Sequence, residues 1–332
     1  MKVALVIPVL TDRVEGVGNL SKDVVIFTTR NDSSLKGAEI RVLEPPKDPS
    51  YTFGGSFESR FNYSYYTASK EGFDLVVTVS GNVVEIPENF IEDYLKVFCE
   101  NSITQVRSAP KSKWYNVLNN SEFFSRGFPL ELRVNYSWKE FPTSGQPDIV
   151  CHMGLWRGDL DLNAVDHLSE SCPREVPELA NTLVGQHFPL SIANVAVRRD
   201  LLVALFQIPT YFKTGSNTFL RGWGDVWSGY ILQRLASIRN QHTSVGYPIV
   251  TRKIPVVLSK QIQSELYGYV ISRYFCKWVD QSSDVAPESY PAMYNKLSKN
   301  LLDSTSRVPY FCRQLFTNMA RAMLNWSKLF LE

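Results

Sequence analysis

The sequence lacks the features that mark several large classes of protein. No apolar run reaches the length of about 18 residues that a membrane-spanning helix needs. Neither sign of charge dominates, because 35 lysines and arginines stand against 33 aspartates and glutamates, a formal charge of +2. That balance is not the strong basic excess typical of nucleic-acid-binding proteins, although it does not exclude one. We therefore expect an ordinary globular protein with no membrane span.

Paired cysteines and metal-spaced histidines are also absent. The five cysteines are odd in number and form no C-x-x-C pair, so we interpret them as reduced thiols of a cytoplasmic protein. His152 and His167 stand too far apart for a metal-binding pair and are interpreted as satisfied polar residues. The apolar run at residues 3–10 is broken by Pro8 and has no small-residue cleavage site, which favours a strand over a signal peptide.

The apolar residues that are present predict an α/β fold. They make up 44% of 332 residues, enough for a large core. Residues 3–10, 24–28 and 75–79 are continuous aliphatic runs typical of strands buried on both faces of a parallel sheet. Residues 60–72 and 86–100 have helical spacing. The first of these segments lies between the second and third apolar runs and the other follows the third, as in a doubly wound sheet.

The C-terminal part has a different pattern. Residues 290–331 have helical spacing with a break at Val308-Pro309, and the last helix is expected to pack on the core or on a partner chain. We therefore predict a main domain over residues 1–265 and a helical extension over residues 266–332 packed on it.

Polar residues follow the three predicted strands. They include Asp12 and Arg13 after the first strand, Asp32 after the second and Asn82 after the third. Ligands of parallel sheets bind beyond the carboxyl ends of the strands, so these residues are candidates for binding a nucleotide. The alternative is that each belongs to an ordinary polar turn.

An unusual turn brings two arginines close together in the sequence. Arg126 and Arg133 bracket Gly127-Phe128-Pro129-Leu130, in which glycine and proline restrict the backbone. A fixed guanidinium suits the recognition of a diphosphate or a carboxylate. The alternative is a surface loop with two solvated arginines.

The segment from Arg126 to Arg133 resembles the Arg-Gly-Tyr-Pro-Phe-Ser-Leu-Arg motif of the reversibly glycosylated polypeptides. These are the UDP-arabinopyranose mutases and their relatives, which have a GT-A glycosyltransferase fold. Gly154-Leu155-Trp156 and the segment through Asp161 are similar to a second motif of that family. The resemblance implies a GT-A-like sheet and a UDP-sugar ligand, with Trp156 and Asp161 in its binding site.

Two later segments extend the resemblance. Residues 188–197 are similar to a family segment in which Asn194 is the polar residue of an apolar run. A buried asparagine must be hydrogen-bonded, either to a substrate hydroxyl or to backbone groups. Residues 221–230 match at Asp225 and Trp227, and the resemblance places Asp225 near the sugar and the acceptor, as a base or a ligand of hydroxyls. The alternative for Asp225 is a plain helix N-cap.

The resemblance fails where the family binds a divalent cation. The family has Asp-Asp-Asp after the third strand, whereas this chain has Ser80-Gly81-Asn82. Mg²⁺ and Mn²⁺ prefer carboxylate oxygens, so we name no metal ligand and no certain cofactor. Asp159-Leu160-Asp161 has the Asp-x-Asp pattern of a metal-binding motif, but the resemblance places it in another motif. Either arginines neutralise the diphosphate without a metal, or the chemistry has been lost.

Three functions follow from this reading. The first is a UDP-sugar mutase that interconverts the ring forms of a UDP-pentose such as UDP-arabinose, with Arg126, Asp225 and Arg133 as catalytic candidates. The second is a transferase that moves the sugar to a separate acceptor, such as a glycan, a protein or a modified nucleic-acid base. The third is a non-catalytic subunit of a homo- or hetero-oligomer. Trp223, Trp227, Arg252 and Lys253 could line the side for a large anionic acceptor.

Overall fold

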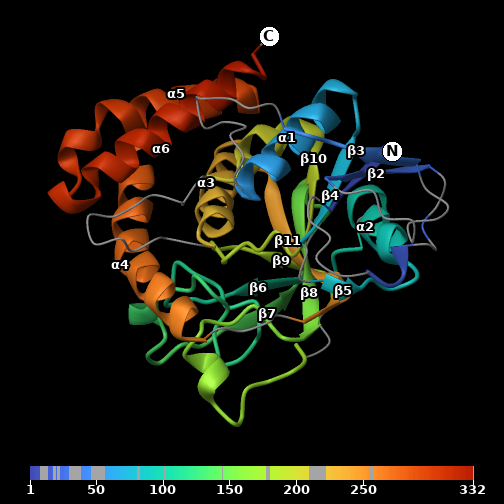
Figure 1. The fold of residues 1–332 in the computed structure, drawn as a ribbon. Coiled ribbons are helices and arrows are strands. Elements are labelled where there is room, and N and C mark those ends of the chain that lie inside the picture. Colours follow the sequence, from blue (N-terminus) through green and yellow to red (C-terminus); the bar gives the residue numbers. More distant parts are fainter. Residues whose placement is uncertain are drawn as a thin grey trace.

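The computed structural model describes most of the chain, namely residues 1–7, 14–17, 20, 23–29, 39–45, 57–80, 83–100, 102–143, 145–176, 180–208, 222–253 and 258–331. One large sheet runs through the molecule, with helices packed around it (Figure 1). Among the described residues, no helix is long and apolar enough to cross a membrane.

The N-terminal half of the sheet is parallel. Its strands lie in the order β3-β2-β1-β4 and are β1 (Val3–Ile7), β2 (Val24–Thr28), β3 (Glu39–Val42) and β4 (Leu75–Val79). Every residue of β1, β2 and β4 is buried, as the continuous apolar runs predicted. The connection between β3 and β4 contains α1 (Phe57–Lys70), close to the helix predicted at residues 60–72.

Beyond β4 the sheet is mixed. β10 (Asn194–Arg198) is antiparallel to both β4 and β8 (Ile149–Gly158), and β11 (His242–Arg252) is parallel to β8. The carboxyl ends of β1, β2, β4, β8 and β11 therefore lie at one edge of the sheet. Short strands complete it: β5 (Val83–Glu85) beside the end of β11, then β9 (Thr182–Val184), β6 (Gln105–Ser108) and β7 (Lys139–Pro142).

Helices cover the sheet and form a group at the C-terminus (Figure 1). The remaining ones are α2 (Phe90–Cys99), α3 (Gly224–Ile238), α4 (Leu258–Ser282), α5 (Tyr290–Asp303) and α6 (Tyr310–Lys328). Short 3-10 turns are η2 (Leu130–Leu132), η3 (Asp166–Leu168), η4 (Arg199–Leu205) and η5 (Thr305–Arg307). The break predicted at Val308-Pro309 is confirmed, because Pro309 is the N-cap of α6.

The C-terminal helices share the core of the main domain. Trp326 of α6 is fully buried, stacks on Phe206 with ring centroids 5.2 Å apart and donates a hydrogen bond from Nε1 to the carbonyl of Val203 at 2.8 Å. The predicted boundary at residue 265 falls inside α4, so one helix belongs to both proposed parts. The predicted α/β class, a sheet flanked by helices with further helices at the C-terminus, is confirmed by the strand order and the helices.

Candidate active site

Arg126 lies between two aspartates that are far from it in the sequence. Its Nε and Nη2 donate to Asp161 Oδ1 and Oδ2 at 3.0 and 3.2 Å. Its Nη1 and Nη2 donate to Asp225 Oδ1 and Oδ2 at 3.3 and 2.7 Å. Nη1 also donates to the carbonyl of Gly222. All five N–H donors of this guanidinium therefore have acceptors within the protein.

The backbone around Arg126 places it in this position. Its amide donates to the carbonyl of Asp161 at 2.7 Å, and Ser125 forms an isolated bridge with Leu162. Gly127 has a φ of +90°, and a Cβ at that position would lie 2.7 Å from a methyl carbon of Val226 on α3. A larger residue would therefore push the turn away from the helix that carries Asp225.

Asp225 lies in the first turn of α3, where a carboxylate also interacts favourably with the helix dipole. Its Oδ1 accepts from the amide of Val226 at 2.9 Å as well as from Arg126. The N-cap residue itself is Trp223, so the plain N-cap alternative for Asp225 is not what the structure has.

Burial makes the charges of this cluster strongly interdependent. The side chains of Arg126, Asp161 and Asp225 are only 13%, 9% and 8% exposed. Burial opposes the charged form of Asp161, but the guanidinium groups of Arg126 and Arg252 outweigh it and hold its pKa well below the ordinary value. Burial likewise opposes the charge of Arg126, yet Asp161 and Asp225 raise its pKa. Arg126 and Asp161 are therefore both charged at neutral pH.

A second buried arginine completes the cluster. Arg252 is the last residue of β11, its side chain is 5% exposed, and its Nη1 lies 3.7 Å from Asp161 Oδ1, too far for a hydrogen bond. Neither Nε nor Nη1 of Arg252 has a hydrogen-bond partner among the described residues. Burial is the main reason that its pKa is lowered. Arg252 therefore has N–H donors without an acceptor among the described residues, whereas every N–H of the Arg126 guanidinium has one.

Trp156 lies beneath Arg252 and belongs to the same cluster. The Arg252 guanidinium lies 5.7 Å from the centroid of the Trp156 ring, and Trp156 Nε1 has no hydrogen-bond partner among the described residues. Sequence reasoning placed Trp156 and Asp161 in the site but did not include Arg252 among the site residues. The signal for Arg252 was a cation directly at the end of a long apolar and β-branched run.

Arg133 forms a separate ion pair beside the cluster. Its Nη1 donates to Asp166 Oδ2 at 3.3 Å, and its guanidinium lies 5.0 Å from the ring centroid of Phe124. Its Nη2 donates to the hydroxyl of Tyr269 at 3.4 Å, and that hydroxyl accepts from the amide of Gly127 at 3.3 Å. Arg133 therefore connects the Arg126 turn to α4, and neither arginine is a solvated loop residue.

Asn194 has a structural set of partners. It is fully buried, and its Nδ2 donates to the carbonyls of Leu155 and Pro248 at 3.0 and 2.8 Å. Its Oδ1 accepts from the hydroxyl of Tyr94 at 2.5 Å. Of the two alternatives for this asparagine, the backbone partner is the one observed, and the predicted contact with substrate gains no support.

Trp227 and His152 also lie in the core. Trp227 is fully buried, stacks on Phe275 with centroids 4.9 Å apart and donates from Nε1 to Ser272 Oγ at 2.7 Å. Its surroundings are those of a packing residue rather than of a binding residue. The ring nitrogens of His152 lie 2.8 Å from Ser244 Oγ and 2.6 Å from the carbonyl of Tyr247, and burial lowers its pKa to about 4.

The predicted nucleotide-binding residues Asp12, Arg13, Asp32 and Asn82 lie outside the described residues. The strands that precede them end at the same edge of the sheet as β8 and β11, which carry Trp156 and Arg252. Nucleotide binding by these four residues stays a prediction.

The described residues do not fit a divalent cation. No group of three His, Cys, Asp or Glu side chains comes together within them. Asp159 accepts from Arg174 at 2.6 Å and Asp161 is bound to Arg126, so the two carboxylates of Asp159-Leu160-Asp161 are held by different arginines. Glu85 Oε2 accepts from Thr251 Oγ1 at 2.7 Å and lies 3.5 Å from Arg157. We therefore derive no step through a metal.

No family model and no curated protein matches the chain, so the family resemblance is not confirmed. Similar solved structures include glucosyl-3-phosphoglycerate synthase from Mycobacterium tuberculosis in complex with Mn²⁺ and UDP-glucose, 10% identical over 82% of this chain and 78% of that one, with a TM-score of 0.38. A mannosyltransferase from Pyrobaculum calidifontis in complex with GDP-mannose and Mn²⁺ is 9% identical over 98% and 73%, with a TM-score of 0.34. These values are too low to transfer an activity, and the fold assignment rests on the strand order of the chain itself.

Proposed function

We propose that this protein is a glycosyltransferase that moves a sugar from a UDP-sugar to a separate acceptor. The observation that carries the proposal is the convergence of three motifs that are far apart in the sequence. Arg126, Asp161 and Asp225 meet in one buried cluster, at the edge of the sheet where parallel strands end and ligands bind. Structural ion pairs of this burial are uncommon unless they serve specificity or a site.

Arg252 supplies the cation that the reaction needs. In the transfer, the bond between the anomeric carbon and the diphosphate oxygen breaks, and the electron pair goes to the diphosphate. An acceptor hydroxyl oxygen forms the new bond to that carbon and loses its proton. The unpartnered Nε–H and Nη1–H of Arg252 are placed to stabilise the negative charge on the leaving diphosphate. A buried donor acts in a low dielectric, where such a contact is strongest.

Asp225 is the proposed carboxylate on the side of the sugar and the acceptor. Its Oδ2 accepts one hydrogen bond, from Arg126 at 2.7 Å, and retains a lone pair for a hydroxyl. The two contacts with Arg126 hold this carboxylate in one orientation. Arg126 is therefore a positioning residue in this proposal, and Asp161 holds it from the other side.

The UDP-pentose mutase is the second candidate, favoured by the same convergence of motifs. In the resembling family the arginine at the position of Arg126 is glycosylated. Here both carboxylates raise the pKa of Arg126, and all its N–H groups are bonded. A guanidinium in that state is a poor nucleophile because its lone pairs are delocalised and its protons are held. The transferase therefore ranks first.

The test separates the three functions. UDP-arabinopyranose and UDP-arabinofuranose are incubated separately with the protein, with and without glycan or hydroxymethylated DNA, and nucleotide and sugar products are resolved by chromatography. UDP binding is measured alongside by titration calorimetry, with ADP, CDP and GDP as comparisons. We expect UDP binding, no interconversion of the ring forms, and release of UDP only when an acceptor is present.

Asp225→Asn should abolish transfer while UDP binding persists, and Asp159→Asn serves as the matched control because Asp159 pairs with the exposed Arg174 outside the cluster. Interconversion without acceptor would favour the mutase instead. Absence of heat with every nucleotide, in a protein with a normal melting transition, would leave only the non-catalytic subunit.

A further inference from the structure

The charge of the protein is concentrated at its C-terminus. Residues 290–331 contain six lysines and arginines but only one aspartate, a formal charge of +5 in a chain whose total is +2. All six of these cations are exposed on α5, η5 and α6. The nearly balanced charge of the whole chain therefore includes a basic hairpin made of α5, η5 and α6. An uneven distribution of charge along a chain indicates an anionic partner.

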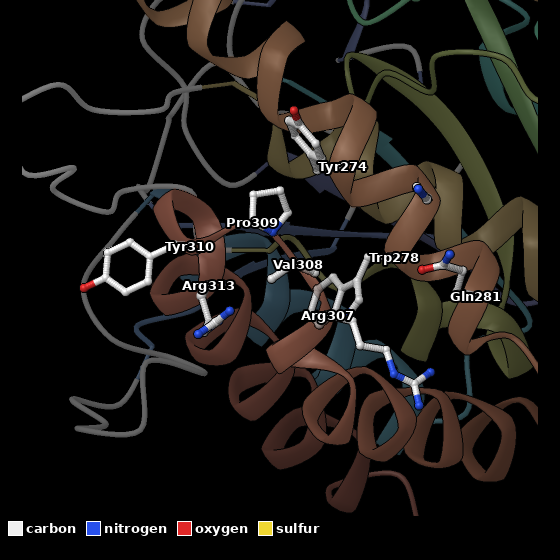
Figure 2. A pocket seen from close by; sticks show the side chains of 9 residues that line it. Tyr274, Trp278, Gln281, Arg307, Val308, Pro309, Tyr310 and Arg313 are labelled. Carbon is white, nitrogen blue, oxygen red and sulfur yellow. The ribbon is translucent and has the colours of Figure 1, made fainter.

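A groove lies where this hairpin meets α4 (Figure 2). It has a volume of about 680 Å³ and contains no acidic side chain. Its lining residues come from α4 and from the segment that joins η5 to α6; they are Tyr274, Lys277, Trp278, Gln281, Arg307, Val308, Pro309, Tyr310 and Arg313. We call this feature the α4–α6 groove.

The three cations of the α4–α6 groove are not used by ion pairs among the described residues. No carboxylate lies within ion-pair distance of Lys277, Arg307 or Arg313 there. Arg313 donates one N–H to the carbonyl of Ser306 at 3.1 Å and keeps its other donors. Three unneutralised cations around one concave surface attract phosphate or carboxylate groups.

Exposed aromatic rings accompany these cations. Tyr310 is 86% exposed and Phe311 is 61% exposed, which is unusual for large rings at the start of a helix. The guanidinium of Arg313 lies 5.8 Å from the centroid of the Tyr310 ring, and Phe311 packs edge-on against Tyr274 at 5.5 Å. These contacts hold the rings beside the cations, where they could stack on planar bases.

We propose that the α4–α6 groove binds a single strand of nucleic acid, with Lys277, Arg307 and Arg313 on backbone phosphates and Tyr310 on a base. Cations beside exposed aromatic rings are the combination that single-strand-binding surfaces use. A smaller hollow next to the groove shares Gln281 and Arg307 but carries Asp284 and Asp303. Those carboxylates repel phosphates, so the strand leaves the groove on the side of Tyr310 and Arg313.

The groove is distinct from the candidate active site but joined to it by α4. Tyr269 of α4 contacts Arg133 and Gly127, whereas Tyr274, Lys277 and Gln281 of the same helix line the groove. Eight residues of helix from Tyr269 to Lys277 span about 12 Å. Binding in the groove does not depend on the proposed transfer activity, although it would bring a nucleic-acid acceptor near the cluster.

The experiment measures fluorescence anisotropy of a labelled mixed-sequence DNA strand of about 12 nucleotides, without any sugar donor, between about 50 and 200 mM salt. The test variant combines Lys277→Ala, Arg307→Ala and Arg313→Ala. The matched control combines Lys296→Ala, Lys299→Ala and Arg321→Ala, which removes the same charge from exposed positions of α5 and α6 outside the groove lining.

We expect the groove variant to lose affinity about tenfold or more at low salt and its salt dependence to fall by about 2 in log–log slope, as for three lost phosphate contacts. The control variant should lose much less affinity for the DNA strand. Tyr310→Ala should weaken binding about fivefold with an unchanged salt slope, because stacking is not ionic. Melting temperature and UDP binding of each variant report that the fold and the candidate site are intact.

Three outcomes would overturn the proposal: no binding of the strand by the unaltered protein, equal losses in the groove and control variants, or groove-dependent binding to phosphatidylserine vesicles instead of DNA. If UDP fails to bind while the groove variant still loses the strand, the proposed function fails and the groove proposal stands.

Discussion

The two buried arginines of the candidate site, Arg126 and Arg252, differ in their hydrogen bonding, which their sequence positions do not reveal. All N–H groups of the Arg126 guanidinium are bonded to Asp161, Asp225 and the carbonyl of Gly222, whereas Nε and Nη1 of the buried Arg252 have no hydrogen-bond partner in the described part of the chain. A buried charge without hydrogen bonds destabilises a fold, and such groups are retained where a ligand satisfies them. At the residue scale, we therefore expect removal of the Arg252 side chain to affect ligand binding more than it affects stability.

Replacement of Arg252 by methionine should change the free energy of unfolding little, because the loss of its attraction to Asp161 offsets the removal of a buried charge whose Nε and Nη1 lack hydrogen bonds among the described residues. Affinity for UDP should fall at least tenfold, since a charge-assisted hydrogen bond contributes about 1.5–3 kcal/mol. Urea unfolding and titration calorimetry measure the two effects. The exposed neighbour Lys253→Met is the control, and a variant that loses stability but keeps UDP affinity would contradict the assignment.

Asp161 predicts a pH dependence. Its pKa in the folded state is held well below the ordinary value of about 3.9 by Arg126 and Arg252 against the effect of burial. Its contribution to stability is therefore present above about pH 4 and is lost as pH falls below that value. The difference in unfolding free energy between the unaltered protein and Asp161→Asn should be largest above pH 4 and shrink towards pH 2.5.

Urea unfolding across this pH range is the measurement. Asp159→Asn is the control, because Asp159 pairs with an arginine that is 72% exposed. A difference for Asp161→Asn that stays constant from pH 6 to pH 2.5 would show that the loss comes from packing rather than from charge.

At the scale of elements, the centre of the sheet depends on one side chain. The register between β8 and β11 shifts between Gly246 and Ile249, which leaves carbonyls without strand partners. Asn194 of β10 reaches across this irregularity to the carbonyls of Leu155 and Pro248. A Cβ on Gly154 would lie 2.1 Å from Asn194 Nδ2, so the glycine provides the space that the amide occupies.

Asn194→Leu should lower the free energy of unfolding by about 2–5 kcal/mol, because two buried carbonyls and the Tyr94 hydroxyl lose their partners at once. Tyr94→Phe removes only the bond to Asn194 Oδ1 and should cost about 1 kcal/mol. Urea unfolding of the two variants measures the difference between their free energies of unfolding. Equal effects of the two changes would mean that the bonds to Leu155 and Pro248 contribute nothing.

At the scale of the whole molecule, the C-terminal helices are part of a single core. Buried residues of α5 and α6 belong to the same cluster as those of β1, β4 and α3. Trp326 connects them through Val203 and Phe206, so the predicted helical extension should not unfold by itself. The basic hairpin that we propose as a nucleic-acid-binding surface is therefore packed on the rest of the core.

Trp326→Ala should destabilise the whole protein by about 3–5 kcal/mol, as expected for removal of a fully buried aromatic ring. Tyr310→Ala removes a ring that is 86% exposed and should stay within about 0.5 kcal/mol. Calorimetry should show one transition in both variants. A second, low-temperature transition confined to the Trp326 variant would mean that the hairpin is an independent unit.

The three strands at the start of the sheet and several helices could be predicted from sequence, whereas the other strands and the partners of charged residues could not. The runs at residues 24–28 and 75–79 match β2 and β4 because a strand buried on both faces must be apolar along its whole length. The first predicted run contains β1 at Val3–Ile7, and its last three residues lie outside the described residues. Arg126 and Arg133 were named as a pair, but each binds a different aspartate, Asp161 and Asp166, because turns orient side chains in ways that spacing does not define.

The sequence by itself determined the layers of this protein, since apolar periodicity depends only on which faces of each element must leave water. It also supplied four of the five residues of the cluster, namely Arg126, Trp156, Asp161 and Asp225, through the motifs that contain them. Only the tertiary structure decided that Asp161 and Asp225 share one arginine and that Nε and Nη1 of Arg252 are buried without a hydrogen-bond acceptor among the described residues. It also decided that three cations line a groove whose lining contains no carboxylate. Those properties depend on distances between segments far apart along the chain, and electrostatic interactions act through such distances rather than through sequence order.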